Sequence, residues 1–205
     1  MFNQSYLRPG FAAATLAVIY PMYWMYAALL GGRDIEHAYY ANVMRLDGSD
    51  LVYLMMGALE IYVYASLRKI LHDHHNFRGL DVVLALLICN AVFFYIAQLG
   101  IDVGLHLYGD HLGSATTSSI IGIGSLASLS GIMLFGALGL LMSIVLLRGA
   151  IELPPLLRVF AYVTALSSLF QLTLVFWFAA VFLLPLSLLV LAAHFVRKPD
   201  MIEVV

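Results

Sequence analysis

Charged residues are scarce in this chain of 205 residues. Asp, Glu, Lys and Arg make up 11% of it, against about 25% in an average soluble domain. Ten Lys and Arg residues face twelve Asp and Glu residues, which gives a formal charge of −2. A chain without a basic excess lacks the cationic surface that binds phosphate backbones, so we expect no nucleic-acid partner.

Cysteine is nearly absent as well, since Cys89 is the only one. One cysteine excludes an internal disulfide, a cysteine-rich metal cage and an iron–sulfur cluster. Apolar residues dominate instead: 63% of the chain is hydrophobic, and its mean hydropathy is +0.96. A water-soluble globule of this size could not hide so much apolar surface, and disordered chains have the opposite composition. The sequence therefore predicts an all-α, polytopic integral membrane protein that is embedded in the lipid bilayer as a helical bundle.

Six hydrophobic stretches divide the chain on the scale of a membrane span, which needs about 20 apolar residues. The last apolar block, 156–196, is too long for one span, so we expect a turn near Trp177–Ala180. Pro185 then falls inside the sixth helix, where neighbouring helices can compensate the lost hydrogen bond. The predicted spans of this single domain, residues 1–205, are 11–30, 51–70, 82–105, 118–147, 156–176 and 179–196.

Lys and Arg residues alternate between the loops, and cytoplasmic loops carry the excess. The cations that precede span one, join spans two to three and four to five, or follow span six are Arg8, Arg68, Lys69, Arg78, Arg148, Arg158, Arg197 and Lys198. The second outer loop has neither Lys nor Arg. The first outer loop has two basic residues, which four acidic residues outnumber. This pattern predicts that both termini are cytoplasmic, in a bacterial inner membrane.

The first span and the loop after it carry further signals. The apolar stretch of the first span exceeds the core of about 7–15 residues of a secretory signal, so we expect a retained anchor. Apolar residues near one helical face of the first outer loop predict a short helix in the outer interface; they are Ile35, Ala38, Tyr39, Val43 and Leu46. The run Asp47–Gly48–Ser49–Asp50 predicts a turn and an N-cap for span two.

Glu60 is the only carboxylate near the middle of a predicted span. It lies eight residues before Arg68, which is about 12 Å along a helix. Antiparallel packing of spans two and three would bring Asn90 to the same level, and Tyr64 is a second possible partner one turn away. An ionisable residue in hydrocarbon marks a functional site or a specific contact. Glu60 is therefore either a proton- or cation-binding carboxylate or a hydrogen-bonded residue that locks two helices together.

Polar residues recur along span three. Asn90, Gln98, Asp102 and His106 are spaced at multiples of four, which winds about 40° around a helix per step. As a functional feature this stripe would line a hydrated half-channel that leads outward from Glu60. As a structural feature it would be the face that packs inside the bundle through interhelical hydrogen bonds.

Span four is rich in small residues at intervals of four, a pattern that lets another helix approach closely. The positions expected to contact other membrane subunits are Gly122, Gly124, Ser128, Gly131, Gly139 and Ser143. They occupy more than one face of the helix. The pattern therefore predicts tight packing, with a partner inside or outside the chain.

None of the seven histidines lies near a span centre, so we expect no bis-histidine haem. His106 and His111 flank Asp110 in the second outer loop, and His37 in the first outer loop could approach them. Imidazole and carboxylate are suitable ligands for zinc or copper. The outer face is thus a candidate transition-metal site, with a solvated loop as the alternative, and no other cofactor is expected.

Signatures of catalysis are missing from the sequence. It contains no HExxH, GxSG or CxxC motif and no phosphate-cradling glycine loop, so we expect no enzyme. The leading hypothesis is a non-catalytic scaffold or assembly subunit of a larger inner-membrane complex, of a secretion, conjugation or respiratory type. The alternative is a small homo-oligomeric transporter or channel that uses Glu60 and the stripe on span three. A third hypothesis is a membrane protein that binds metal at its outer face.

Overall fold

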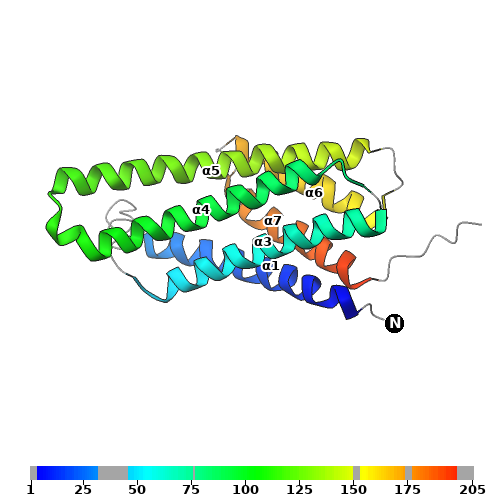
Figure 1. The fold of residues 1–205 in the computed structure, drawn as a ribbon, viewed down its shortest axis with the longest axis horizontal. Helices are drawn as coiled ribbons and strands as arrows, with labels where there is room; N and C mark the ends of the chain where they lie inside the picture. The colour runs from blue at the N-terminus through cyan, green and yellow to red at the C-terminus, as the bar shows by residue number, and fades with distance from the viewer. Residues whose placement is uncertain (1–3, 32–45, 76, 150–152, 174–176, 198–205) are drawn as a thin grey trace, which may run out of the picture.

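The computed structural model describes residues 4–31, 46–75, 77–149, 153–173 and 177–197. Within these ranges it is all-helical (Figure 1). The six α-helices are α1 (Gln4–Gly31), α3 (Gly48–His75), α4 (Asp81–Tyr108), α5 (Ser114–Arg148), α6 (Pro155–Leu172) and α7 (Trp177–Val196). A short 3₁₀ helix, η1 (Gly109–His111), joins α4 to α5. The predicted all-α class is confirmed.

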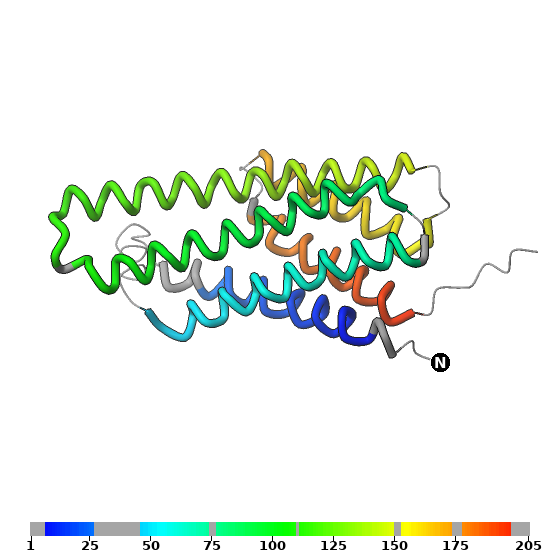
Figure 2. Tube along the Cα trace, in the orientation of Figure 1, coloured from blue at the N-terminus to red at the C-terminus, as the bar shows by residue number. Residues whose placement is uncertain are grey.

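The α-helices form a closed ring in chain order. Each helix packs against the one before and the one after it, and α1 completes the ring by packing along α7. Successive helices run in opposite directions, so the start of α1 and the end of α7 lie at the same end of the bundle (Figure 1, Figure 2). A closed ring has an interior to which every helix contributes one side.

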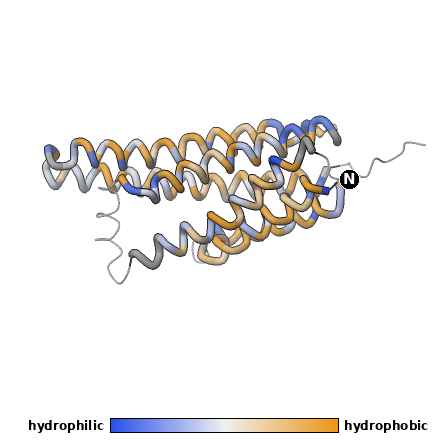
Figure 3. Tube along the Cα trace, turned by 90° about the horizontal axis from the view of Figure 1, so that it is seen from below, coloured by the Kyte–Doolittle hydropathy of each residue, from blue (hydrophilic) through white to orange (hydrophobic). Residues whose placement is uncertain are grey.

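The outer surface of the ring is apolar. Five helical segments are long and apolar enough to cross a membrane, namely Gly48–Asp73, Asp81–Tyr108, Ser114–Arg148, Pro155–Leu172 and Phe178–Val196. Large apolar side chains face outward on all six helices; Phe11, Val82 and Ile123 are 69%, 70% and 68% exposed. Contiguous exposed apolar surface suits lipid rather than water, and the most hydrophilic stretches gather toward the two ends of the bundle (Figure 3). These features fit a helical membrane bundle, whereas the count of six spans and the cytoplasmic termini stay predictions.

The predicted turn and cap before span two are present at Asp47. Its carboxylate accepts hydrogen bonds from the backbone N–H and the hydroxyl of Ser49, both at 2.6 Å. The Asp47 backbone N–H in turn donates to the Asp50 carboxylate at 2.8 Å. This reciprocal arrangement is a capping box built from two aspartates, and it starts α3 at Gly48. The interfacial helix predicted around Ile35–Val43 lies outside the described residues.

The break between the last two helices comes earlier than predicted. Helix α6 ends at Leu172, and α7 has already begun at Trp177. The prediction of a turn near Trp177–Ala180 was therefore wrong. No Gly, Pro or charged residue marks the end of α6. At this end the Thr173 hydroxyl donates to the Phe170 carbonyl at 2.9 Å. Pro185 lies inside α7, as predicted.

The helices of the ring differ greatly in length. Helix α5 has 35 residues and α6 has 18, or about 52 and 27 Å at 1.5 Å per residue. A Cβ added to Gly136 of α5 would contact Leu172, the last residue of α6. The first half of α5 therefore extends beyond α6, and the hairpin of α4 and α5 projects past the α6–α7 pair (Figure 1).

Candidate functional site

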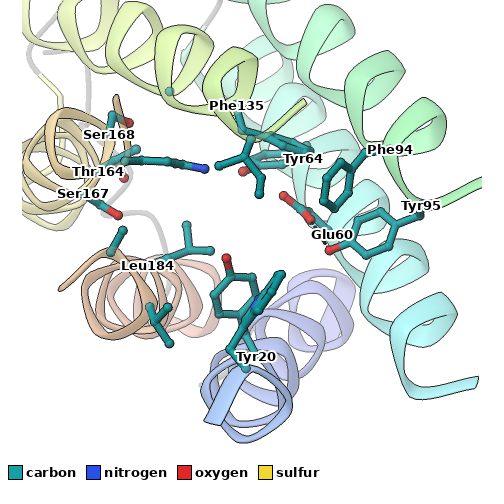
Figure 4. Close-up of a pocket in the computed structure, with 16 residues that line it drawn as sticks. Tyr20, Glu60, Tyr64, Phe94, Tyr95, Phe135, Thr164, Ser167, Ser168 and Leu184 are labelled. Atoms are coloured by element: carbon teal, nitrogen blue, oxygen red, sulfur yellow. Dashed lines mark hydrogen bonds between the residues drawn. The ribbon is translucent and has the colours of Figure 1, made fainter. Parts of the chain in front are cut away.

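Glu60 lies on the inner side of the ring. It is 8% exposed, and its Oε2 atom accepts a hydrogen bond at 2.9 Å from the hydroxyl of Tyr95 on α4 (Figure 4). The predicted partner Tyr64, one turn along α3, lines the same cavity as Glu60. The carboxyl group is thus held by one tyrosine hydroxyl from the next helix.

Asn90 was expected opposite Glu60 and faces α5 instead. Its side-chain amide donates to the backbone carbonyl of Gly131 at 3.1 Å. Tyr95, which the sequence analysis did not single out, takes the predicted place of Asn90. The reason is steric: a Cβ added to Gly57 of α3 would lie 2.6 Å from Cγ of Tyr95. The bare backbone at Gly57 admits the Tyr95 ring one turn before Glu60 and brings its hydroxyl to the carboxylate.

A cavity of about 100 Å³ adjoins Glu60 at the centre of the ring. All six α-helices contribute to its lining (Figure 4). The residues that line it are Tyr20, Trp24, Glu60, Tyr64, Phe94, Tyr95, Ile132, Phe135, Gly139, Thr164, Ser167, Ser168, Gln171, Ala180, Val181 and Leu184. None of these is Lys, Arg or His, so the described lining offers the Glu60 carboxylate no cationic partner.

Aromatic rings make up the wall on the side of Glu60. The ring of Phe94 meets the rings of Tyr95 and Phe135 edge to face, at centroid distances of 5.4 and 5.9 Å. These separations fall in the range preferred by aromatic pairs. A Cβ added to Gly131 of α5 would lie 2.7 Å from the Phe94 ring, so this glycine seats Phe94 as Gly57 seats Tyr95. The aromatic wall is therefore held in place by glycines of the neighbouring helices.

The opposite wall comes mainly from α6 and is polar. Thr164, Ser167, Ser168 and Gln171 recur at intervals of three and four, which places them on one helical face. Figure 4 shows the labelled hydroxyl residues across the cavity from Glu60. The Thr164 hydroxyl is buried and has no hydrogen-bond partner among the described residues. Sequence reasoning missed this wall, although the three-to-four spacing of its hydroxyl residues was a usable signal.

The remaining stripe residues of α4 pack against α5. The Gln98 amide donates to the Asp102 carboxylate at 3.2 Å, and the Ser128 hydroxyl of α5 donates to the Gln98 side-chain oxygen at 2.9 Å. Asp102 is buried, whereas His106 is exposed. The stripe therefore does not continue the cavity around Glu60, and its central members form a separate hydrogen-bonded contact between two helices.

Tyrosines lie between the two buried carboxylates. The Tyr53 ring centroid lies 4.6 Å from that of Tyr95 and 5.6 Å from that of Tyr23. Asp50 and Asp102 interact electrostatically with Tyr23 and with each other. A continuous set of aromatic rings thus leads from an acidic group near the start of α3 to Glu60.

Most of the small residues of span four are used within the chain. Added Cβ atoms at Gly124 and Gly131 would meet Ile101 and Phe94 of α4, and one at Gly139 would meet Ser168 of α6, each within 2.8 Å. Ser143 is fully buried. Only Gly122 of the six predicted contact positions is both exposed and open on its outer side. The tight packing was predicted, and within the chain its partners are α4 and α6; contact with another subunit stays a prediction.

The candidate metal site at the outer face is only partly visible. His106 and His111 are exposed, while His37 and the Asp110 side chain lie outside the described residues. The described residues contain no group of three His, Cys, Asp or Glu placed to hold a metal ion. The outer site stays a prediction from the sequence.

Comparisons with protein-family models, curated proteins and solved structures find no match to this chain. The site is therefore interpreted from its own geometry.

Proposed function

We propose that this protein is a small transporter of the bacterial inner membrane, and that its central cavity holds the transported solute beside Glu60. The observation that supports it is the lining, to which all six helices of a closed ring contribute. In transporters, solute sites lie between helices near the middle of the membrane, where relative movement of the helices can open them to either side. Glu60 lies about 12 Å from the level of Arg68 along α3, a depth that fits such a site.

The cavity favours this function over a purely structural role for Glu60. A carboxyl group that only joins α3 to α4 requires its partner Tyr95 and close packing around the pair. Here the same group borders open space, and a void forfeits the dispersion contacts of the atoms that line it. A scaffold does not use open space at its centre, whereas a solute-binding protein requires it.

The transport proposal is tested with purified protein in liposomes on a solid-supported membrane. Charge movement is recorded on sudden exposure to small amines, amino acids, carboxylates, sugars, sodium and potassium. We expect a current with at least one class of solute, and its loss in Glu60→Gln, which keeps the size of the side chain. Absence of current with every class, in protein that elutes as a folded species, would contradict the proposal.

The orientation is tested separately. A reporter that is active only in the cytoplasm should be active when fused after Lys198 and silent when inserted at Gly109. The reverse result would invert the proposed topology.

A second candidate function is the scaffold subunit of a larger membrane complex. The first half of α5 favours it, because this segment extends beyond α6 and exposes Ile123, Leu126 and Leu129. An apolar face on a projecting hairpin is a suitable contact for another subunit. A fixed stoichiometric complex that withstands purification in mild detergent would favour this function, and a homo-oligomer or monomer would count against it. Neither candidate assigns catalysis to this chain.

A further inference from the structure

The described lining of the cavity has one acidic side chain and no basic one, which restricts the charge of a ligand. Glu60 enters from α3, and no Lys, Arg or His is present in the described lining. A negatively charged ligand would meet a carboxylate without any compensating cation, which disfavours it strongly in a site with little water. The charge of the lining therefore points to a positively charged ligand.

The aromatic wall strengthens this selection. Tyr20, Tyr64, Tyr95, Phe94 and Phe135 surround the Glu60 carboxylate (Figure 4). Aromatic faces carry negative charge density, and together with a carboxylate they recognise ammonium groups. A bare metal cation prefers a complete shell of oxygen ligands, and the rings of Phe94 and Phe135 beside Glu60 supply none. An organic ammonium group, with a charged head and an apolar stem, fits this wall better.

The opposite wall indicates what the other end of the ligand carries. Thr164 is 6% exposed, and its buried hydroxyl has no hydrogen-bond partner among the described residues. A buried hydroxyl without a partner loses the hydrogen bonds that it makes in water. A ligand hydroxyl that reaches Thr164 would restore one of them.

The volume limits the ligand to a few atoms. The cavity measures about 100 Å³, somewhat less than the engineered cavity of about 150 Å³ that binds benzene. A ligand of about four or five heavy atoms therefore fits without displacing side chains.

We infer that the cavity binds a small amino alcohol in its ammonium form, with the ammonium group at Glu60 and the hydroxyl group at Thr164. This inference rests on the proposed function of the cavity and names the class of its solute.

The test uses four probes of similar size. Ethanolamine has both groups, propylamine lacks the hydroxyl, 1-propanol lacks the charge, and glycolate reverses it. For the three probes with four heavy atoms, the dissociation constant is limited to about 40 μM or weaker, so binding is measured by saturation-transfer NMR in detergent. We expect the order ethanolamine, then propylamine, with 1-propanol and glycolate at least about tenfold weaker than ethanolamine.

Two variants and a control test which side chain binds the ammonium group of the ligand and which binds its hydroxyl group. Glu60→Gln should weaken both amines by about tenfold or more and leave 1-propanol unchanged. Wild-type protein should bind ethanolamine about fivefold more tightly than propylamine. Thr164→Val keeps the shape of the side chain and should remove this difference. Ser130→Ala is the matched control, because Ser130 is exposed on α5 and bonds only to the Leu126 carbonyl of its own helix. It should change none of the four affinities.

The outcomes separate the ligand class from the transport function. Equal or tighter binding of 1-propanol or glycolate would overturn the ligand class, and so would amine binding that is insensitive to Glu60→Gln. Either result leaves a solute cavity in place, so transport could still hold for another solute. Amine binding without any current in liposomes would support the ligand class and overturn transport. Failure of all four probes to bind wild-type protein would overturn the ligand class.

Discussion

Glu60 and Asp102 are buried carboxyl groups on neighbouring helices, 8% and 7% exposed, but their surroundings differ. Asp102 is bonded to Gln98, which is bonded in turn to Ser128, and the three side chains connect α4 to α5. Glu60 is bonded to Tyr95 of α4 and borders a cavity of about 100 Å³. Burial alone therefore does not identify a functional carboxylate, and the open space beside it is what distinguishes Glu60.

Replacing Glu60 with Leu should produce the largest loss of stability. It removes the hydrogen bond between α3 and α4 and leaves the Tyr95 hydroxyl without its acceptor. We expect a decrease of about 1–3 kcal/mol in the free energy of unfolding in detergent. Glu60→Gln keeps an acceptor and should stay within about 1 kcal/mol of wild type. Equal stability of the Leu variant and wild type would show that the bond to Glu60 does not hold the ring together.

Gly57→Ala should disturb the same cavity through its aromatic wall. The added Cβ would lie 2.6 Å from the Tyr95 ring, so the ring must move away from Glu60. Overpacking of this kind costs about 1–3 kcal/mol, against a gain of up to about 1 kcal/mol from replacing a helical glycine.

Gly122→Ala is the matched control for Gly57→Ala, since nothing lies within 4 Å of the added Cβ there. It should be neutral or stabilising by up to about 1 kcal/mol. Thermal unfolding of the two variants side by side measures the difference, and equal midpoints would contradict the steric role of Gly57.

Asp102→Leu should have a smaller effect, because it removes one side-chain contact from a helix pair that is packed along its whole length. By comparison with other interhelical hydrogen bonds, we expect a loss of about 0.6–2 kcal/mol. Asp102→Asn should be close to neutral, since its amide oxygen can still accept from Gln98. A larger loss for Asp102→Leu than for Glu60→Leu would reverse the comparison between the two regions.

The sequence was sufficient to predict the helices and the place of Glu60 inside the bundle. Each predicted span overlaps one α-helix, because apolar runs of about 20 residues are a strong signal, and the cap at Asp47–Asp50 follows from local hydrogen bonding. The turn after α6 was misplaced because Thr173 ends that helix without a Gly, Pro or charged residue.

The partners of Glu60 depend on how α3 and α4 are rotated against each other. Gly57 of α3 sets that rotation by admitting the Tyr95 ring, and Gly131 of α5 admits the Phe94 ring in the same way. A pattern within one helix cannot reveal which ring meets which glycine. The sequence therefore could not show that Tyr95, and not Asn90, lies opposite Glu60. The three-to-four spacing of the hydroxyl residues of α6 was enough to predict that they share one helical face. The sequence could not show that this face lines a cavity.

The most direct test of the central claim measures solute-evoked current in liposomes for wild type, Glu60→Gln and Asp102→Asn in parallel. Both variants remove a buried carboxylate and keep its shape, so they differ only in which region they alter. We predict that current is lost in Glu60→Gln and retained in Asp102→Asn, with all three proteins eluting at the same size. Retained current in Glu60→Gln, together with its loss in Asp102→Asn, would contradict the account by placing the functional carboxylate at the α4–α5 contact.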